Sequence, residues 1–247
     1  QQPVHKDARL LLAHLSAVLG DIEEARGLYE GLLVERAEID VLHQAAAFYF
    51  GPGDDLGRAR GCLERLLVRS PKDVDALTRM GRVELAQGRV DAAEAVLQQA
   101  LAVDPGTREA LLLLARISDE IAEDPNQAEH LLRKALKAHP FDPVSHFNLA
   151  VHLSRTDQWP EAVRHLERAS SFAPGGVFPE AHLALARLHS GRGEEAQARS
   201  RLEELLLAVD DAVMIDTARS ELASLSDQDS AKNQTNLKEP EKKEGRR

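Results

Sequence analysis

Histidines, a cysteine and paired acidic residues are the side chains of this sequence that could do chemistry, as metal ligands, nucleophiles or general acids. The sequence has ten histidines and one cysteine, Cys62. No two histidines have the His-Glu-x-x-His spacing that places two imidazoles on one helix face to bind zinc, and Cys62 has no second thiol as a co-ligand. His43, His146 and His182 instead lie about one or three times 34 residues apart, in one column of a repeat, which indicates packing positions rather than metal ligands. We therefore predict no metal site and no cofactor.

Motifs for phosphate binding and nucleophilic catalysis are also missing from the sequence. The glycine clusters Gly51-Pro52-Gly53 and Gly175-Gly176 have the composition of turns between helices. No Gly-x-Ser-x-Gly sequence, which would present a nucleophilic serine, occurs. The acidic pairs Glu23-Glu24, Asp54-Asp55 and Glu194-Glu195 stand at predicted helix starts, where carboxylates stabilise the positive end of the helix dipole. We therefore predict that the chain is not an enzyme.

The charge and hydropathy of the chain narrow the class of partner. It has 31 basic and 41 acidic residues, which give a net charge of −10 at pH 7. A protein with this charge is repelled by phosphate backbones and anionic lipid surfaces, so we predict no nucleic-acid partner. The most apolar run, Ala110 to Ile117, is too short to cross a bilayer, which needs about 20 apolar residues. We therefore predict no membrane insertion.

Three columns of residues recur at intervals of about 34 along nearly the whole chain. One contains prolines, one contains only alanines, and one contains only alanine or glycine. The members are Pro71, Pro105, Pro140 and Pro174; Ala25, Ala59, Ala93, Ala128, Ala162 and Ala198; and Ala13, Ala47, Gly81, Ala115, Ala150 and Ala186. Three columns in phase predict a tandem array of one structural unit.

Each repeat is predicted to consist of a helix, a turn and a second helix. In the third repeat the first helix covers residues 74–86 and stops before Gly88, because glycine adopts the left-handed conformation that ends a helix. Asp91 and Glu94 have the spacing of a capping box at the start of the second helix. Small residues such as Ala93 in both helices allow the two backbones to approach closely. The proline that follows prevents the second helix from continuing.

These residues resemble the tetratricopeptide repeat (TPR) family, a 34-residue helix-turn-helix unit. In the third repeat Gly81, Ala93, Ala100 and Pro105 fall on the small residues and the proline of the family pattern. The departures are His43, His146 and His182, where the family favours tryptophan, and Ala37 and Asp210 in place of proline. The resemblance implies an all-α fold, an α-solenoid of about six such repeats with a C-terminal capping helix.

The domain boundaries follow from the columns. We place an N-terminal extension at 1–5, the repeats at 6–39, 40–73, 74–107, 108–142, 143–176 and 179–212, a capping helix at 213–225 and a tail at 226–247. The tail is rich in charged and amide residues and has one leucine, so it cannot bury enough apolar surface to fold. We therefore predict that it is disordered.

In the family that the chain resembles, the first helices of successive repeats line a concave groove that binds partner proteins. The residues that the resemblance places in this groove are His14, Gln44, Phe48, Arg79, Arg82, Arg116, Phe147, Asn148 and Arg187. Because arginine recurs there in an acidic protein, we predict a partner segment with apolar and acidic residues. The alternative is that the arginines are solvated, with Arg79 and Arg116 paired to Asp75 and Glu120 at i,i+4 spacing.

The predicted function is thus that of a scaffold or adaptor that binds a peptide or helix of another protein. Two alternatives stay open: a C-terminal regulatory region of a larger enzyme or sensor, and a periplasmic or lipoprotein assembly factor. A cytoplasmic location is favoured over a periplasmic one, which would require that a signal segment was removed. Homo-oligomerisation is compatible with the sequence.

Overall fold

The computed structural model describes residues 3–34, 38–173 and 178–236, and the side chains of residues 6–34, 38–173 and 178–226. Within these ranges the chain forms thirteen α-helices and no strand, which confirms the predicted all-α class. The helices are α1 (Pro3–Leu19), α2 (Ile22–Val34), α3 (Ile39–Phe50), α4 (Leu56–Arg69), α5 (Val74–Ala86), α6 (Val90–Val103), α7 (Arg108–Glu120), α8 (Pro125–Ala138), α9 (Pro143–Arg155), α10 (Trp159–Phe172), α11 (Pro179–Gly191), α12 (Glu195–Ala208) and α13 (Ala212–Asn236). The chain divides into two compact units, unit 1 (Gln1–Ala138) and unit 2 (His139–Arg247).

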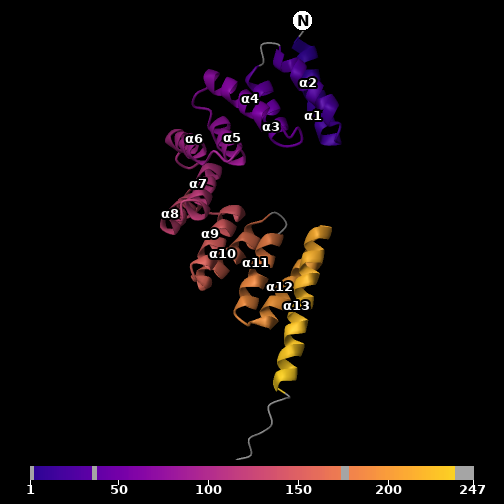
Figure 1. Cartoon of the computed structure of the whole chain (residues 1–247), viewed down its shortest axis with the longest axis vertical. Coiled ribbons are helices and arrows are strands. Elements are labelled where there is room, and N and C mark those ends of the chain that lie inside the picture. The colour runs from indigo at the N-terminus through magenta and orange to yellow at the C-terminus, as the bar shows by residue number, and fades with distance from the viewer. Residues whose placement is uncertain (1–2, 35–37, 174–177, 237–247) are drawn as a thin grey trace, which may run out of the picture. The chain divides into compact units, whose positions relative to one another are not determined.

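Each unit is a stack of helix pairs in chain order (Figure 1). In unit 1 the pairs are α1–α2, α3–α4, α5–α6 and α7–α8, and the second helix of each pair packs on the first helix of the next. Unit 2 contains the pairs α9–α10 and α11–α12, and α13 packs on α12 and α11. The described residues therefore confirm the predicted fold class of six helix-turn-helix pairs with an additional C-terminal helix. None of the described helices combines the length and apolar character needed to span a bilayer.

Close approach of the two helices in a pair depends on the small residues. All six members of the alanine column in the second helices are fully buried. In the third pair Gly81 of α5 lies directly against Leu97 of α6, because a Cβ atom added at Gly81 would be 2.6 Å from Leu97 Cγ. Real side chains do not approach this closely, so a side chain at position 81 would force Leu97 to move.

The second pair departs from the predicted register. Ala47, a member of the small column, is exposed, whereas its neighbour Ala46 is buried. Phe48 is also buried, and its ring stacks on Tyr29 with centroids 4.9 Å apart. The helix ends at Phe50, and the five residues that connect it to α4 replace the short turn of the other pairs. Tyr29 and Phe48 thus fill space that smaller side chains fill elsewhere, and α3 turns a different side toward its partner helix.

Helix starts and ends agree with the sequence in part. Gly88, two residues after the end of α5, has a φ of 73°, the left-handed conformation predicted for the glycine that ends this helix. However, α6 begins at Val90 with Arg89 at its N-cap, so Asp91 lies in the first turn and does not cap the helix. The connection between α5 and α6 is three residues long, and α6 begins one residue before Asp91. Its carboxylate acts there on the helix dipole.

The last helix is longer than predicted. It continues to Asn236, whereas the sequence placed a disordered tail from Ser226 onward. No proline or glycine occurs between Ser226 and Asn236, and a helix that is already nucleated adds residues at little cost. Residues 237–247 of the predicted tail lie outside the described residues. At the other end, α1 begins at Pro3, inside the predicted extension 1–5, because proline is tolerated in the first turn of a helix.

Candidate partner-binding groove

The first helices bring the predicted groove residues into separate groups in each unit. His14, Gln44 and Phe48 line one pocket between α1 and α3. Arg79 and Arg82 line a second, smaller pocket of about 140 Å³ with Phe50 and Val83. Phe147 and Arg187 line a third pocket, in unit 2. Arg116 is exposed on α7, and the side chain of Asn148 donates a hydrogen bond to the carbonyl of Val144 at 2.8 Å.

The pocket between α1 and α3 is mainly apolar and has a volume of about 530 Å³. Leu11 and Val18 of α1 form one wall, and Phe48 forms part of the other. His14 is exposed at this pocket and Gln44 is half-buried. Phe48 is buried and stacked on Tyr29, so it belongs to the fixed wall of the pocket and is not a free side chain.

Two of the three groove arginines of unit 1, Arg79 and Arg82, already have acidic partners within the chain, whereas the predicted pair of Arg116 with Glu120 is not among the ion pairs of the described residues. Arg79 Nε lies 2.8 Å from Asp75 Oδ2, which is the i,i+4 pair expected from the sequence. Arg82 Nη1 lies 3.2 Å from Glu109 Oε1 of α7, and the Arg82 guanidinium lies over the Phe50 ring at 4.7 Å from its centroid. These arginines are half exposed, and such pairs exchange readily with other carboxylates.

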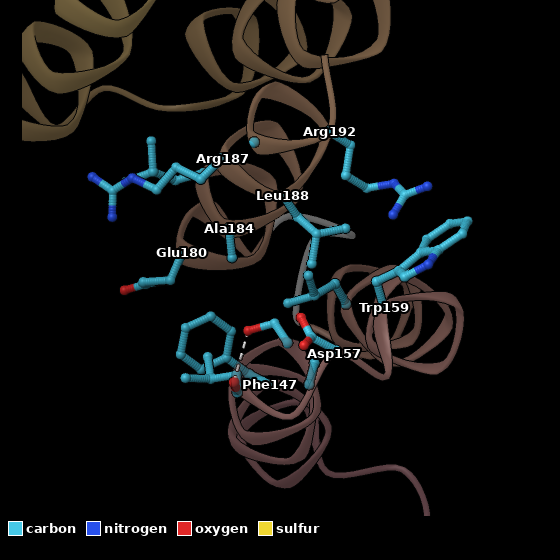
Figure 2. A pocket seen from close by; sticks show the side chains of 14 residues that line it. Phe147, Asp157, Trp159, Glu180, Ala184, Arg187, Leu188 and Arg192 are labelled. Carbon is cyan, nitrogen blue, oxygen red and sulfur yellow. Dashed lines mark hydrogen bonds between the residues drawn. The ribbon is translucent and has the colours of Figure 1, made fainter. Parts of the chain in front are cut away.

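The pocket of unit 2 is the largest of these, with a volume of about 600 Å³, and it lies among α9, α10 and α11. Its floor is apolar and includes Ala150 and Leu183. Figure 2 shows Phe147 on one side, with Ala184 and Leu188 facing it across the space. Pockets of this size and composition accept one or two large apolar side chains of a ligand.

Charged residues lie at both edges of the unit 2 pocket. In Figure 2 Glu180 and Arg187 stand toward one edge, and Arg192 and Trp159 lie together at the other. The Arg192 guanidinium is 3.5 Å from the centroid of the Trp159 ring, a cation–π contact. Arg187 Nε lies 2.7 Å from Glu221 Oε1 of α13, so the last helix supplies the partner of this groove arginine.

Arg192 belongs to a small polar network next to the pocket. Its Nε donates to Glu194 Oε1 at 3.0 Å, and His189 Nδ1 lies 2.6 Å from Glu194 Oε2. The hydrogen bonds from His189 and Arg192 lower the pKa of Glu194. This carboxylate therefore stays ionised and orients the guanidinium over Trp159.

Sequence reasoning missed Trp159 and Arg192 at this site. Trp159 is the only tryptophan of the chain, and this was the one signal available. Tryptophan and arginine are enriched where proteins bind one another, because they combine large contact area with a polar group. Their stacking could not be read from the sequence, because it depends on how the turn after α11 approaches the start of α10.

Two buried histidines are the chain neighbours of residues that line the unit 2 pocket. His146 precedes Phe147 on α9, and His165 precedes Leu166 on α10; their Nδ1 atoms are 2.8 Å apart. His146 Nε2 lies 3.1 Å from the carbonyl oxygen of Pro140 and donates to it, so His146 Nδ1 accepts the proton of His165. Burial lowers the pKa of both histidines. His146 thus has a packing role, as expected, and His165 is buried beside it.

Among the side chains that the structure describes, no three from His, Cys, Asp or Glu come together in a way that could hold a metal ion. Cys62 is buried in α4, and burial raises the pKa of its thiol to about 11.

Comparison with known proteins gives a consistent result. Family models described as tetratricopeptide repeat match residues 54–117, residues 122–177, and residues 7–30 together with 179–204. No curated protein matches the chain.

Solved structures are similar over most of the chain. A tetratricopeptide repeat protein from Parabacteroides merdae has a TM-score of 0.68 at 15% identity, over 91% of this chain and 86% of that chain. PilF from Pseudomonas aeruginosa has a TM-score of 0.65 at 17% identity, over 87% and 97% of the two chains. PilW, a type IV pilus biogenesis factor, has a TM-score of 0.62 at 22% identity, over 82% and 95%. At these identities the likeness concerns the fold.

Proposed function

The chain belongs to the tetratricopeptide repeat family, and from this premise we propose that it is a scaffold or adaptor that binds a segment of a partner protein along its first helices. Proteins with this fold generally mediate protein–protein interactions and are typically non-catalytic. The unit 2 pocket is the observation that carries the proposal, because it combines an apolar floor with two arginines at its edges.

The partner segment is a helix or peptide with large apolar side chains and an acidic residue. An apolar side chain enters between Phe147 and Leu183, where burial of its surface supplies most of the binding free energy. A carboxylate of the partner replaces Glu221 at Arg187, since the two charges of that pair are exchangeable near the surface. This replacement contributes to specificity more than to affinity, because one ion pair is exchanged for another.

Arg187 and Val151 are suited to a test of this site, because both line the pocket and both are exposed. We would immobilise the whole chain and the variants Val151→Glu and Arg187→Glu and identify retained proteins by quantitative mass spectrometry. The matched controls are Leu207→Glu on α12, which replaces an exposed apolar residue, and Arg164→Glu on α10, which replaces an exposed arginine. Circular dichroism verifies that every variant is folded.

A partner bound in the unit 2 pocket is retained by the two controls and lost from the two pocket variants. Titration of that partner should then show a Kd raised at least about tenfold by Val151→Glu, because a carboxylate is forced into an apolar contact. Equal retention by all variants would refute the site. A fifth variant, Val18→Glu, changes the pocket between α1 and α3. If the partner is lost from this variant alone, it binds in that pocket instead.

A further inference from the structure

Four charged side chains line the unit 2 pocket, two of each sign, and all four are exposed. They are Asp157, Glu180, Arg187 and Arg192. Both arginines have acidic partners, since Arg187 lies 2.7 Å from Glu221 and Arg192 lies 3.0 Å from Glu194. By contrast, neither Asp157 nor Glu180 has an ion pair within the described part of the chain. The charges of this pocket that lack a partner are therefore both negative.

The two carboxylates are held on different elements around the apolar floor. Glu180 is the second residue of α11, and Asp157 lies in the connection between α9 and α10. In Figure 2 Glu180 stands at one edge of the pocket, and Asp157 lies nearer to Trp159. A carboxylate in a first turn also stabilises its helix through the dipole, but this role does not neutralise its charge toward a ligand. A peptide that places an apolar side chain in this pocket can therefore reach a carboxylate in two directions.

The existing ion pairs decide which charge of a ligand is favoured. An acidic residue has to displace Glu221 or Glu194 from its arginine, so one ion pair is exchanged for another. A basic residue at Asp157 or Glu180 forms an ion pair where the free protein has none. The net charge of −10 also attracts a basic segment before contact and raises its association rate. The pocket is thus complementary to cations on either side of an apolar group.

We propose that the unit 2 pocket binds a partner segment in which a large apolar side chain is flanked by lysine or arginine residues, and that Asp157 and Glu180 determine this preference. The inference rests on the function proposed above, because it concerns the same pocket. It adds basic residues to the acidic residue at Arg187. The apolar side chain supplies most of the binding free energy, and the basic residues govern the choice among partners.

The first experiment selects ligands from a displayed library of random peptides. The whole chain is immobilised, and the library is offered in parallel to the variant Val151→Glu and to the double variant Asp157→Asn, Glu180→Gln. Peptides that the parent retains and Val151→Glu loses are those that bind in the pocket. These peptides should contain a large apolar residue with lysine or arginine close to it on one or both sides. Peptides retained by the double variant should lack this preference.

The second experiment measures the contribution of each carboxylate. A selected peptide without tryptophan is titrated into the chain, and the fluorescence of Trp159, the single tryptophan of the chain, reports binding at the pocket. Each single substitution should raise Kd about threefold and the double substitution about tenfold, because exposed ion pairs contribute modestly. Glutamine in place of the basic residues of the peptide should cost the same factor with the parent chain and nothing with the double variant. Added salt should reduce the difference between parent and double variant.

Matched controls separate the charge of the pocket from the charge of the protein. Asp54 is the equivalent of Asp157 in the second pair, and both have a left-handed backbone, with φ of 44° and 58°. Asparagine adopts this conformation as aspartate does, so Asp54→Asn and Asp157→Asn should both be folded. Glu203→Gln, at an exposed position of α12, is the control for Glu180→Gln. Asp54→Asn and Glu203→Gln should leave Kd unchanged, and an equal rise in Kd with these controls would overturn the proposal.

The outcomes distinguish this inference from the function on which it rests. Val151-dependent peptides that are uncharged or only acidic would overturn the preference for basic residues and leave the pocket as a partner site. A library without any Val151-dependent peptide would overturn both. The chain's own residues 237–247 include five basic residues and are the other occupant to test. A chain that ends at Asn236 should bind the peptide with the same Kd, whereas tighter binding would assign the pocket to this segment and overturn the assignment to a partner.

Discussion

Acidification below about pH 6.5 should destabilise unit 2 through its buried histidines. Burial lowers the pKa of His146, His165 and His182, whereas in the unfolded chain histidine has a pKa of about 6.5. Between the folded and unfolded values the unfolded chain therefore binds more protons. The stability that the neutral histidines contribute is fully present above pH 6.5. It is lost as the pH falls through the lowered pKa values of the folded protein.

The geometry of the histidine pair sets the magnitude. One proton lies between the two Nδ1 atoms, 2.8 Å apart, so protonation of His146 at Nδ1 would place two protons face to face. Glu161 lies 3.6 Å from His165 Nε2 and, with Asp142, favours the charged forms, while Arg168 opposes them. Each extra proton bound on unfolding contributes a slope of about 1.4 kcal/mol per pH unit, and two contribute about 2.7. Because each unfolded histidine is already half-protonated at pH 6.5, a fall to pH 5.5 removes at most about 2 kcal/mol through the pair, against the roughly 5–15 kcal/mol typical of a domain.

Urea unfolding from pH 8 to pH 5 measures this slope. The variant His146→Leu, His165→Leu should lose most of it, because neither leucine titrates, whatever its stability at pH 8. His130→Leu, at an exposed position of α8, is the matched control and should keep the parent slope. The reasoning would be refuted by a slope between pH 6.5 and 5 that is the same in the double variant and the parent.

Three further predictions concern stability. Ala93→Leu should lower the free energy of unfolding by about 1–3 kcal/mol in urea, because the site is fully buried at a helix crossing. Burial alone would raise the pKa of Glu84, but hydrogen bonds from Arg89 and Arg60 lower it. The stability that this carboxylate contributes is therefore fully present above about pH 4.3 and is lost as the pH falls below that value. Glu84→Gln should reduce this loss of stability in acid. Asp55 accepts a hydrogen bond from the Arg58 amide at 2.9 Å as the N-cap of α4, so Asp55→Ala should cost about 1 kcal/mol, measured by thermal unfolding.

The helices were predictable because their signals are local and repeated. Every alanine of the alanine column is buried, as predicted for the close packing of the two helices of a pair, and α5 ends just before Gly88, as predicted. The register of α3 was not predictable, because it depends on packing of Phe48 against Tyr29 of another helix. The end of α13 was missed because composition predicts whether a segment can form a core, and not whether an existing helix will continue.

The contacts of the groove arginines were also predictable only where their signal is local. The Arg79–Asp75 pair follows from i,i+4 spacing within one helix. The Arg82–Glu109 pair joins two helices and could not be read from either one. The partner of Arg187 was available in principle, because Glu221 follows it by 34 residues, one repeat period, and so occupies the equivalent position of the next first-type helix. Reading α13 only as a cap hid this relation.

The stacking of helix pairs within each unit has a consequence for how the protein folds and how it unfolds under force. Helix contacts join neighbours in chain order or next neighbours, so the mean sequence separation of touching residues is small. Low contact order favours rapid folding, because little loop-closure entropy is lost before contacts form. A force applied to the two ends should then extract one helix pair after another. A single-molecule extension trace should show this as a staircase whose steps each release about 34 residues, rather than as one cooperative rupture.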